Sequence, residues 1–318
     1  MSIDESLARN EHVAHYVLPI EFDAERKHSS LMFTSDNLYQ SDAGIQLDIS
    51  PFAPHFNNDT QPATTEEDHK ICVQAALVAI QKGTLEKVVV SCVKHAPRKA
   101  TSLESLFLRL VECYPSAFVY LLHHPVFGIW IGATPELLLH KQGKNFRTVS
   151  LAGTQPFSAE SPLVWSEKLQ HEQHVVTDFI LEKLSICNAI QVKLDGPYTA
   201  QAGPLAHLKT DIRFHSIQSS ATIISELQPT PAVCGLPREQ ALAFILEHAK
   251  FDRRLYCGRL GLSFPSGDEI HFVNLRCMQV FEDHFELHVG GGIVAGSTPE
   301  DEWHETEIKA NVLRNLLH

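Results

Sequence analysis

The chain has 318 residues, of which 44% are hydrophobic and 20% charged, a composition typical of a globular protein with a sizeable buried core. Its net charge of −12 argues against broad nucleic-acid binding, because a phosphate backbone requires a cationic face. The sequence has no apolar run near the roughly 20 residues that span a bilayer, and its start does not resemble a signal peptide. Seven widely spaced cysteines indicate reduced thiols, so we expect a cytoplasmic protein without a membrane partner.

Residues 1–63 form the least regular part of the sequence. Residues 15–22 and 44–52 could be edge strands, separated by polar, turn-rich segments. We therefore treat residues 1–63 as a strand-rich N-terminal segment of the same domain as residues 64–318.

The first strongly patterned element is a helix over residues 64–83. Thr64 and Glu67 have the spacing of a capping box, apolar residues recur at helical intervals, and Gly83 suits the end of the helix. The following residues 86–93 (EKVVVSCV) are rich in β-branched residues and predict a buried strand.

The same order of helix and then strands occurs twice along the chain. The first pass continues with a helix over 101–115, and the second contains helices over 161–187, over 237–249 and from Thr298. The expected strands cover residues 117–124, 127–133, 136–142, 146–153, 189–198, 213–223, 254–264, 269–281 and 284–296. Helices that alternate with antiparallel hairpins are typical of an α+β fold rather than a parallel βαβ sheet.

Two charged residues adjoin apolar strands in this pattern. Lys87 begins the strand KVVVSCV; it can be a lysine that extends its ammonium to solvent, or a desolvated lysine able to act as a base. Glu136 follows a Thr-Pro turn in IWIGATPELLLH; it can be a solvated acid at a strand edge, or a partly buried carboxyl that stays protonated near neutral pH.

The segment SEKLQHEQHVV contains His171, Glu172 and His174 within one helical turn. The two histidines lack the i, i+4 spacing that places both imidazoles on one helix face, which argues against a zinc site. Glu172 by itself is better suited to be an oxygen ligand of a hard cation such as Mg²⁺.

The C-terminal stretch HVGGGIVAGSTPEDEWHETEIKAN combines a glycine run with acids and one lysine. Thr298, Pro299, Glu300 and Asp301 are residue types that commonly begin a helix, so they need no functional explanation. Glu302, Glu305 and Lys309 share one helix face, where Glu305 and Lys309 can form a simple i, i+4 salt bridge. The glycines 290–292 weaken a strand unless another group approaches closely, and beside a lysine they suit a carboxylate site.

Several motifs together resemble the chorismate-utilising enzymes, and among them the isochorismate synthases. The matching stretches appear in family order from about residue 85 to the C-terminus: KVVVSCV, FGIWIGATPELLL, VSLAGT, SEKLQHEQHVV, LQPTPAVCGLP, DRRLYCGRLG, VNLRCMQV and GGGIVAGSTPEDEWHETEIK. The resemblance implies a single large α+β domain of two packed, antiparallel-rich sheets flanked by helices. It also implies an isomerase that acts on chorismate.

The resemblance assigns chemical roles to four of these residues. Lys87 matches the general base that activates water for attack on C2 of chorismate, and Glu136 matches the general acid that protonates the departing C4 hydroxyl. Glu172 and Glu305 match the carboxylates that hold Mg²⁺, the expected cofactor.

Five further residues match positions that contact the substrate in the family. Arg276 and Lys309 match cations that bind carboxylate oxygens, aided by Tyr256 and the backbone at Gly290. Thr154 matches a substrate-contacting threonine.

Two positions separate the branches of the family. Anthranilate synthases lack a lysine at the position of Lys87, and aminodeoxychorismate synthases have a nucleophilic lysine at the position of Ala152. Lys87 with a small Ala152 therefore favours water as the nucleophile and isochorismate as the product, for menaquinone or a catechol siderophore. A salicylate synthase, which also eliminates pyruvate, and a non-catalytic chorismate-binding paralogue are the alternatives. We expect no glutaminase subunit, and a monomer or a weak homodimer.

Overall fold

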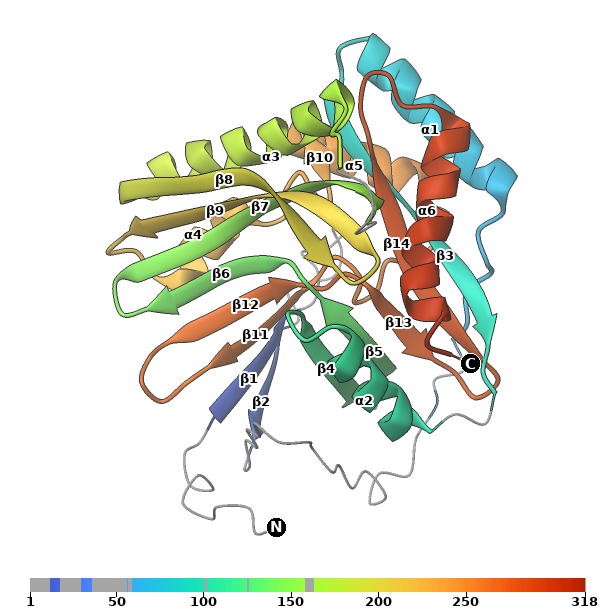
Figure 1. Cartoon of the computed structure of the whole chain (residues 1–318), viewed down its shortest axis with the longest axis horizontal. Coiled ribbons are helices and arrows are strands. Elements are labelled where there is room, and N and C mark those ends of the chain that lie inside the picture. The colour runs from blue at the N-terminus through green and yellow to red at the C-terminus, as the bar shows by residue number, and fades with distance from the viewer. Residues whose placement is uncertain are drawn as a thin grey trace.

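The protein is described from a computed structural model. The described residues are 12–17, 30–35, 56, 59–99, 102–124, 126–157 and 163–317. Their strands form two sheets in which every pairing is antiparallel, and six helices flank these sheets (Figure 1). The predicted α+β class with two antiparallel sheets is therefore confirmed.

The larger sheet has eight strands and includes the most N-terminal part of the described chain. In spatial order its strands are β2 (Ser30–Ser35), β1 (His12–Val17), β11 (Arg259–Ser263), β12 (Glu269–Val273), β6 (Leu137–Gln142), β7 (Asn145–Pro156), β9 (Leu205–His215) and β8 (Ile190–Ala202). The pairing of β1 with β11 joins residues from the two ends of the chain in one sheet.

The smaller sheet has six strands and contains the strand that begins at Lys87. Its order is β10 (Gly235–Leu236), β3 (Lys87–Pro97), β14 (His284–Ile293), β13 (Cys277–Val280), β5 (Gly128–Thr134) and β4 (Phe118–His124). The long central pair of β3 and β14 runs through ten paired positions, which places the glycines of β14 beside the first half of β3.

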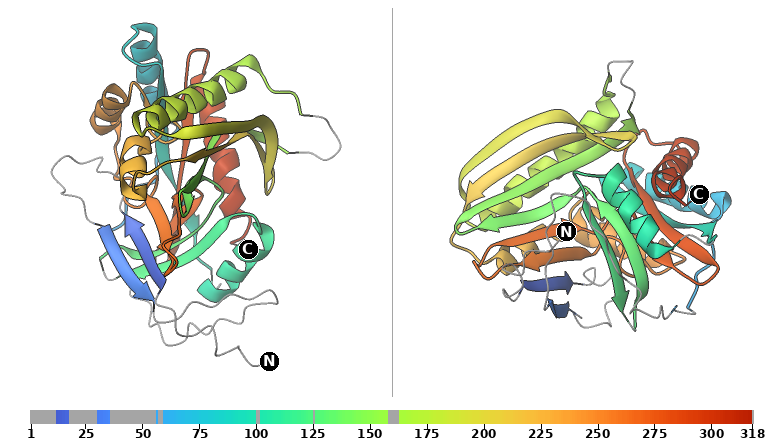
Figure 2. Two further views of the ribbon diagram at one scale, coloured as in Figure 1. Left: turned by 90° about the vertical axis from the view of Figure 1, so that its left-hand side faces the viewer. Right: turned by 60° about the horizontal axis from the view of Figure 1, so that its bottom comes forward.

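The helices cover the two sheets on different sides. They are α1 (Glu66–Gln81), α2 (Leu103–Cys113), α3 (Glu167–Ile186), α4 (Ser220–Leu227), α5 (Arg238–His248) and α6 (Pro299–Arg314). Helix α3 packs along β7 and β9, whereas α1 and α6 lie beside β3 and β14, away from the eight-stranded sheet (Figure 2). The two sheets thus remain open to each other along one seam.

The largest apolar core joins both sheets across this seam. It combines Trp130 of β5 with Leu139 of β6, and Phe179 and Ile180 of α3 pack into the same cluster. A second core lies between the six-stranded sheet and helices α2 and α6, where Leu110 contributes a fully buried side chain. Burial of apolar surface on both sides of the six-stranded sheet stabilises the arrangement of the layers.

The chain changes from one sheet to the other at two tight connections. Thr134 ends β5 of the smaller sheet and β6 of the larger sheet begins at Leu137, while Asn274 lies between β12 and β13. The Thr134 hydroxyl donates to the Val273 carbonyl, and the Val273 amide donates to the Glu136 carbonyl at 3.0 Å. The two connections are therefore bonded to each other at the seam.

The buried Asn274 side chain holds a third segment against these connections. Its Nδ2 donates to the Leu255 carbonyl at 2.7 Å, and its Oδ1 accepts from the Tyr120 hydroxyl at 2.7 Å. Because a buried amide without partners is costly, these bonds specify how residues 255–257 approach the seam.

The expected helix over 64–83 is confirmed, but its capping residue differs from the prediction. Thr65, not Thr64, caps α1 and accepts from the Asp68 amide at 3.1 Å. The Thr64 hydroxyl instead accepts from the Val93 amide of β3 at 3.0 Å. Two adjacent threonines satisfy the local pattern equally, and tertiary contact with β3 selects between them.

Three of the expected strands were wrong in extent. The strand over 254–264 begins only at Arg259. The strand over 213–223 ends at His215, and Ser219 instead caps helix α4 by accepting from the Thr222 amide. The strand over 269–281 is divided between the two sheets at the Asn274 connection. Among the N-terminal expectations, 15–22 overlaps β1, 44–52 lies outside the described residues, and β2 was not expected.

In the described part of the chain, none of the helices combines the length and the apolar character that a bilayer crossing would require.

Truncation of Leu110 tests the core between α2 and the six-stranded sheet. Leu110 is 0% exposed, so Leu110→Ala should lower the free energy of unfolding by about 2–5 kcal/mol through lost burial and a cavity. The matched variant Leu246→Ala, in α5 at 44% exposure, should change it by less than about 1 kcal/mol. Urea unfolding of both variants measures the difference, and equal losses would contradict this assignment of the core.

Candidate active site

A cavity opens at the seam between the sheets, and seven of the nine residues singled out in the sequence line it. These are Glu136, Thr154, Glu172, Tyr256, Arg276, Gly290 and Lys309. The other two, Lys87 and Glu305, each contact one of the lining residues, at 2.8 Å and 2.7 Å respectively. Residues that are up to 222 positions apart in the chain, Lys87 and Lys309, therefore meet at one place.

Lys87 is fully buried at the start of β3 and reaches the cavity through one ion pair. Its Nζ donates to Glu172 Oε1 of α3 at 2.8 Å. Burial opposes ionisation of Glu172, but the charge and hydrogen bond of Lys87 outweigh it and lower the Glu172 pKa. The sequence left open whether Lys87 extends its ammonium to solvent or is desolvated, and the structure shows that it is desolvated.

Glu136 lies in the β5–β6 connection with 5% of its surface exposed. Burial raises the Glu136 pKa to about 7, and the nearby cations Lys87, Lys309 and Arg276 only partly oppose the shift. A carboxyl with this pKa can carry a proton at neutral pH and release it within the same range.

The glycine run of β14 is explained by side chains that press against the strand. A Cβ at Gly290 would lie 3.1 Å from the Tyr256 hydroxyl oxygen, and a Cβ at Gly292 would lie 2.8 Å from Lys87 Cε. The close approach expected from the sequence therefore exists; at Gly292 it comes from side chains, whereas at Gly290 the Val90 carbonyl oxygen would also lie 3.1 Å from the added Cβ.

Helix α6 presents Lys309 and Glu305 to the same corner. Lys309 Nζ donates to the Gly290 carbonyl at 2.8 Å and lies 2.7 Å from Glu305 Oε1. Burial by itself lowers the Lys309 pKa, but Glu305 and the other acids outweigh it, and the net pKa is raised. Lys309 is consequently a fixed cation at the cavity wall.

Glu302 belongs to the site, although the sequence prediction gave it no role. It is 1% exposed; its Oε1 lies 2.7 Å from Lys168 Nζ and accepts from the Ser297 hydroxyl at 2.6 Å. Its Oε2 is buried and has no hydrogen-bond partner among the described residues. The signal for Glu302 was present in the sequence, since it shares a helix face with Glu305 and Lys309.

Three carboxylates surround the glycine strand. A Cβ at Gly291 would lie 2.9 Å from Glu302 Oε2 and 3.8 Å from Glu305 Oε1, and Glu172 approaches Gly292. Burial, and then the charge of Glu305, raise the Glu302 pKa, and Lys168 only partly opposes this shift. An oxygen-only donor set with an unsatisfied buried oxygen suits a hard divalent cation.

Arg276 and Thr154 are connected through His207, a second residue that the sequence did not single out. The His207 Nδ1–H donates to the Gly153 carbonyl at 3.0 Å and lies 3.3 Å from the Thr154 hydroxyl, while Nε2 accepts from Arg276. Burial, and then Arg276, lower the His207 pKa to about 3, so the ring is neutral. A lone histidine in β9 carries no pattern that predicts this bridge.

Burial also acts on Arg276 itself, which lies at the Asn274 connection with a positive φ of 47°. Burial lowers the Arg276 pKa to about 10, which still leaves the guanidinium charged at neutral pH. The cavity therefore has cations at Arg276 and Lys309 and a protonatable acid at Glu136.

His171 and His174, considered in the sequence for zinc, are both exposed on α3. His174 Nδ1 contacts the Gln170 carbonyl at 2.9 Å. Glu172, between them, faces the cavity instead.

Comparison with known proteins identifies the family. The family model described as chorismate binding enzyme matches residues 5–318. The chain belongs to the chorismate-binding enzyme family. This confirms the family named from the sequence motifs.

Individual members of the chorismate-binding family show the same similarity. Isochorismate synthase EntC of Escherichia coli (strain K12) is 32% identical over 269 residues, covering 80% of this chain and 68% of EntC. Isochorismate synthase DhbC of Bacillus subtilis (strain 168) is 31% identical over 282 residues, covering 81% of this chain and 69% of DhbC. The crystal structure of DhbC from Bacillus anthracis superposes with a TM-score of 0.81 at 27% identity, covering 96% of this chain and 84% of that one.

The raised pKa of Glu136 predicts a pH-dependent stability. The unfolded carboxyl titrates near 4.5 and the folded one near 7, so the stabilising contribution is complete below 4.5 and is lost as the pH rises to 7. Glu136→Gln imitates the protonated form and does not titrate. Its free energy of unfolding relative to that of wild type should therefore rise by about 2–3 kcal/mol when the pH is raised from 5 to 8.

Urea unfolding of both proteins at the two pH values measures this gain. The control is Glu239→Gln in α5, the same substitution at an exposed side chain. A Glu136→Gln effect of equal size at pH 5 and pH 8 would contradict the raised pKa.

Proposed function

We propose that the chain is an isochorismate synthase, an isomerase that converts chorismate to isochorismate. The observation that carries the proposal is a cavity that holds Glu136, with its pKa near 7, together with Arg276 and Lys309, while a fully buried Lys87 pairs with the lining residue Glu172. The relatives EntC and DhbC are named as isochorismate synthases, which supports the same reaction.

The charges of the cavity suit a dianionic substrate. In a protein of net charge −12, Arg276 and Lys309 supply the local cations that chorismate carboxylates need. We assign Arg276 and Lys309 to carboxylate binding, with Tyr256, Thr154 and the Gly290 backbone as further contacts. His207 would then hold the Arg276 guanidinium in position.

Base and acid have distinct places in this proposal. Lys87 accepts a proton from the water that attacks C2, and Glu136 donates a proton to the departing C4 hydroxyl. One water is consumed and one water is released, so the product is an isomer of the substrate. In the structure Lys87 pairs with Glu172, which favours the protonated ammonium, so Lys87 can act as a base only if this ion pair weakens. A cation held by Glu172 would weaken the pair by competing for the same carboxylate.

We assign Mg²⁺ to Glu172 and Glu305, with Glu302 as a further carboxylate beside them. The cation would supply charge that binds and orients a substrate carboxylate. The support for this assignment is the approach of all three carboxylates to Gly291 and Gly292, and the unpartnered Glu302 Oε2.

The proposal also covers the product, the pathway, the cellular location and the oligomeric state. Isochorismate for menaquinone or a catechol siderophore is our first choice; a salicylate synthase would in addition release pyruvate, and a binding paralogue would turn over nothing. We place the enzyme in the cytoplasm as a monomer or weak homodimer that needs no glutaminase. We also propose that residues 1–63 complete the domain of residues 64–318, since β1 pairs with β11.

Substitution of Lys87 tests the reaction and its base together. Purified protein with chorismate and Mg²⁺ should form isochorismate, and Lys87→Gln should lower kcat by about 10²–10⁴-fold, because the amide can still bond Glu172 but cannot take a proton. Chromatography of the products measures both. The control Lys82→Gln alters an exposed lysine and should keep wild-type activity. Salicylate and pyruvate as products, or no turnover by wild type, would overturn the proposal.

Substitution of Glu305 tests the metal assignment. Glu305→Gln should raise the Mg²⁺ concentration needed for half-maximal turnover by at least about 10–100-fold, because one anionic ligand is lost, while the far-ultraviolet circular dichroism stays unchanged. Glu300→Gln, on the same helix but exposed and paired with Lys70, is the matched control. An unchanged Mg²⁺ dependence in Glu305→Gln would show that this residue is not a ligand.

A further inference from the structure

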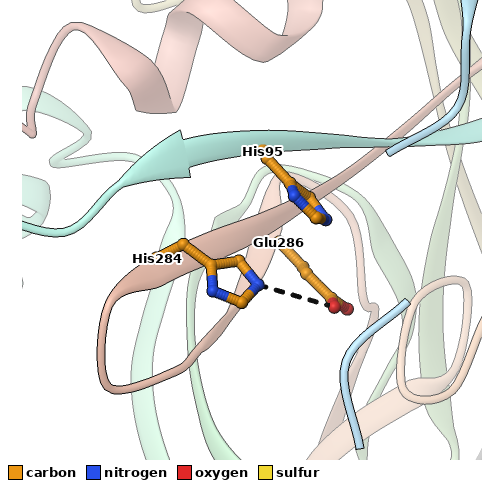
Figure 3. A group of neighbouring side chains, drawn as sticks. All are labelled: His95, His284 and Glu286. Atoms are coloured by element: carbon orange, nitrogen blue, oxygen red, sulfur yellow. Dashed lines mark ion pairs between the residues drawn. The ribbon is translucent and has the colours of Figure 1, made fainter. Parts of the chain in front are cut away.

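A group of side chains of types that can ligate a metal lies on the six-stranded sheet, away from the cavity. One ligand atom from each of His95, His284 and Glu286 lies within 4.8 Å of the others (Figure 3). His95 of β3 and Glu286 of β14 are directly paired across the two strands, and His284 is two residues before Glu286. Side chains two residues apart in a strand point to the same face, so this register brings the three together.

The group is separate from the cavity although it shares strand β14 with it. Glu286 lies four residues from Gly290, or roughly 14 Å along an extended strand. None of His95, His284 and Glu286 lines the cavity.

Both imidazoles are held by an oxygen acceptor on one ring nitrogen. His284 Nδ1 lies 2.7 Å from the Asp283 carboxylate, and His95 Nε2 lies 2.8 Å from the Gln61 carbonyl. Neither oxygen can donate, so in each case the ring donates its N–H and, when neutral, keeps a lone pair on its other nitrogen. Metal-binding histidines in proteins are oriented in this way.

His284 Nε2 gives the strongest indication that a cation binds to this group. It is buried and has no hydrogen-bond partner in the described structure, and it lies 3.8 Å from Glu286 Oε1 (Figure 3). A buried ring nitrogen without a partner is costly, and a cation between it and the carboxylate would satisfy both.

The two oxygens of Glu286 face different groups. Oε2 lies 3.3 Å from the Arg254 guanidinium, while Oε1 accepts from the Gln61 amide at 2.6 Å and lies on the side of the histidines. An oxygen that accepts one hydrogen bond retains a lone pair for a cation, and the side chain is 0% exposed and fixed on both sides.

The geometry points to a transition-metal site formed by His95, His284 and Glu286, with Zn²⁺ as the expected ion and a fourth position open to water. Two imidazoles and one carboxylate are a zinc donor set, and zinc bonds of about 2.0–2.2 Å place the donors roughly 3.4 Å apart. The His284 and Glu286 atoms, 3.8 Å apart, are already near this spacing, and His95 offers a ligand atom within 4.8 Å of both.

This site differs in chemistry from the carboxylates at the cavity. Imidazole nitrogens suit Zn²⁺, whereas Mg²⁺ takes oxygen ligands and retains its waters. The bound ion would also fasten residues 59–61 to the sheet, because Gln61 contacts both His95 and Glu286 and also bonds Asp252. Its role is therefore to hold the end of the β3–β14 pair, independently of catalysis.

Zinc binding by the full chain tests the inference. After dialysis against low-micromolar Zn²⁺ with millimolar Mg²⁺ present, wild type should retain one zinc per chain by elemental analysis. His95→Ala and His284→Ala should each bind Zn²⁺ at least about tenfold more weakly in calorimetry, because one of three protein ligands is lost. Co²⁺ in place of Zn²⁺ should give visible absorption bands in wild type that both variants lose.

Two control variants separate this site from other places where zinc can bind. His215→Ala, at the end of β9 in the other sheet, and Glu305→Gln, at the cavity, should both keep wild-type zinc affinity. Zinc that Mg²⁺ displaces, zinc affinity unchanged in His95→Ala and His284→Ala, or no retained zinc in wild type would each overturn the assignment. Chorismate turnover without added zinc should be unchanged in His95→Ala.

Discussion

The buried ion pair between Lys87 and Glu172 is the contact on which the site depends. Lys87 begins β3 of the six-stranded sheet, and Glu172 lies on α3, which packs on the eight-stranded sheet. Desolvation of both charges is expensive, and their attraction compensates for it only in good geometry, so the pair fixes how the two halves meet. Gly292 of β14 leaves the space that this pair requires.

The three carboxylates near the cavity each form an ion pair with a lysine: Glu172 with Lys87, Glu302 with Lys168 and Glu305 with Lys309. The half-buried Arg276 instead hydrogen-bonds to neutral groups, the His207 ring and the Ala202 carbonyl. An anionic group in the cavity would balance this guanidinium, which is how a protein of net negative charge can bind an anion.

Strand β14 connects two places of different chemistry. Its C-terminal half contains the glycines and leaves room for carboxylates and a hard cation. Its N-terminal half carries His284 and Glu286, two of the three proposed zinc ligands. The segment that bears Tyr256 is close to both, since Arg254 pairs with Glu286 and Tyr256 faces Gly290. Loss of His95 or His284 would therefore loosen the end of the β3–β14 pair and would not alter proton transfer at the cavity.

The sequence by itself determined the fold class, the family and most helices and strands, because hydrophobic period, caps and motif order are local signals. It also predicted the nine site residues that the structure brings together, although their roles are still predictions. Only the tertiary structure decided the position of the sheet changes at Thr134 and Asn274, the inclusion of Glu302 and His207, and the group around His284. Those features depend on which strands pair and which side chains lose water, and a one-dimensional pattern contains neither.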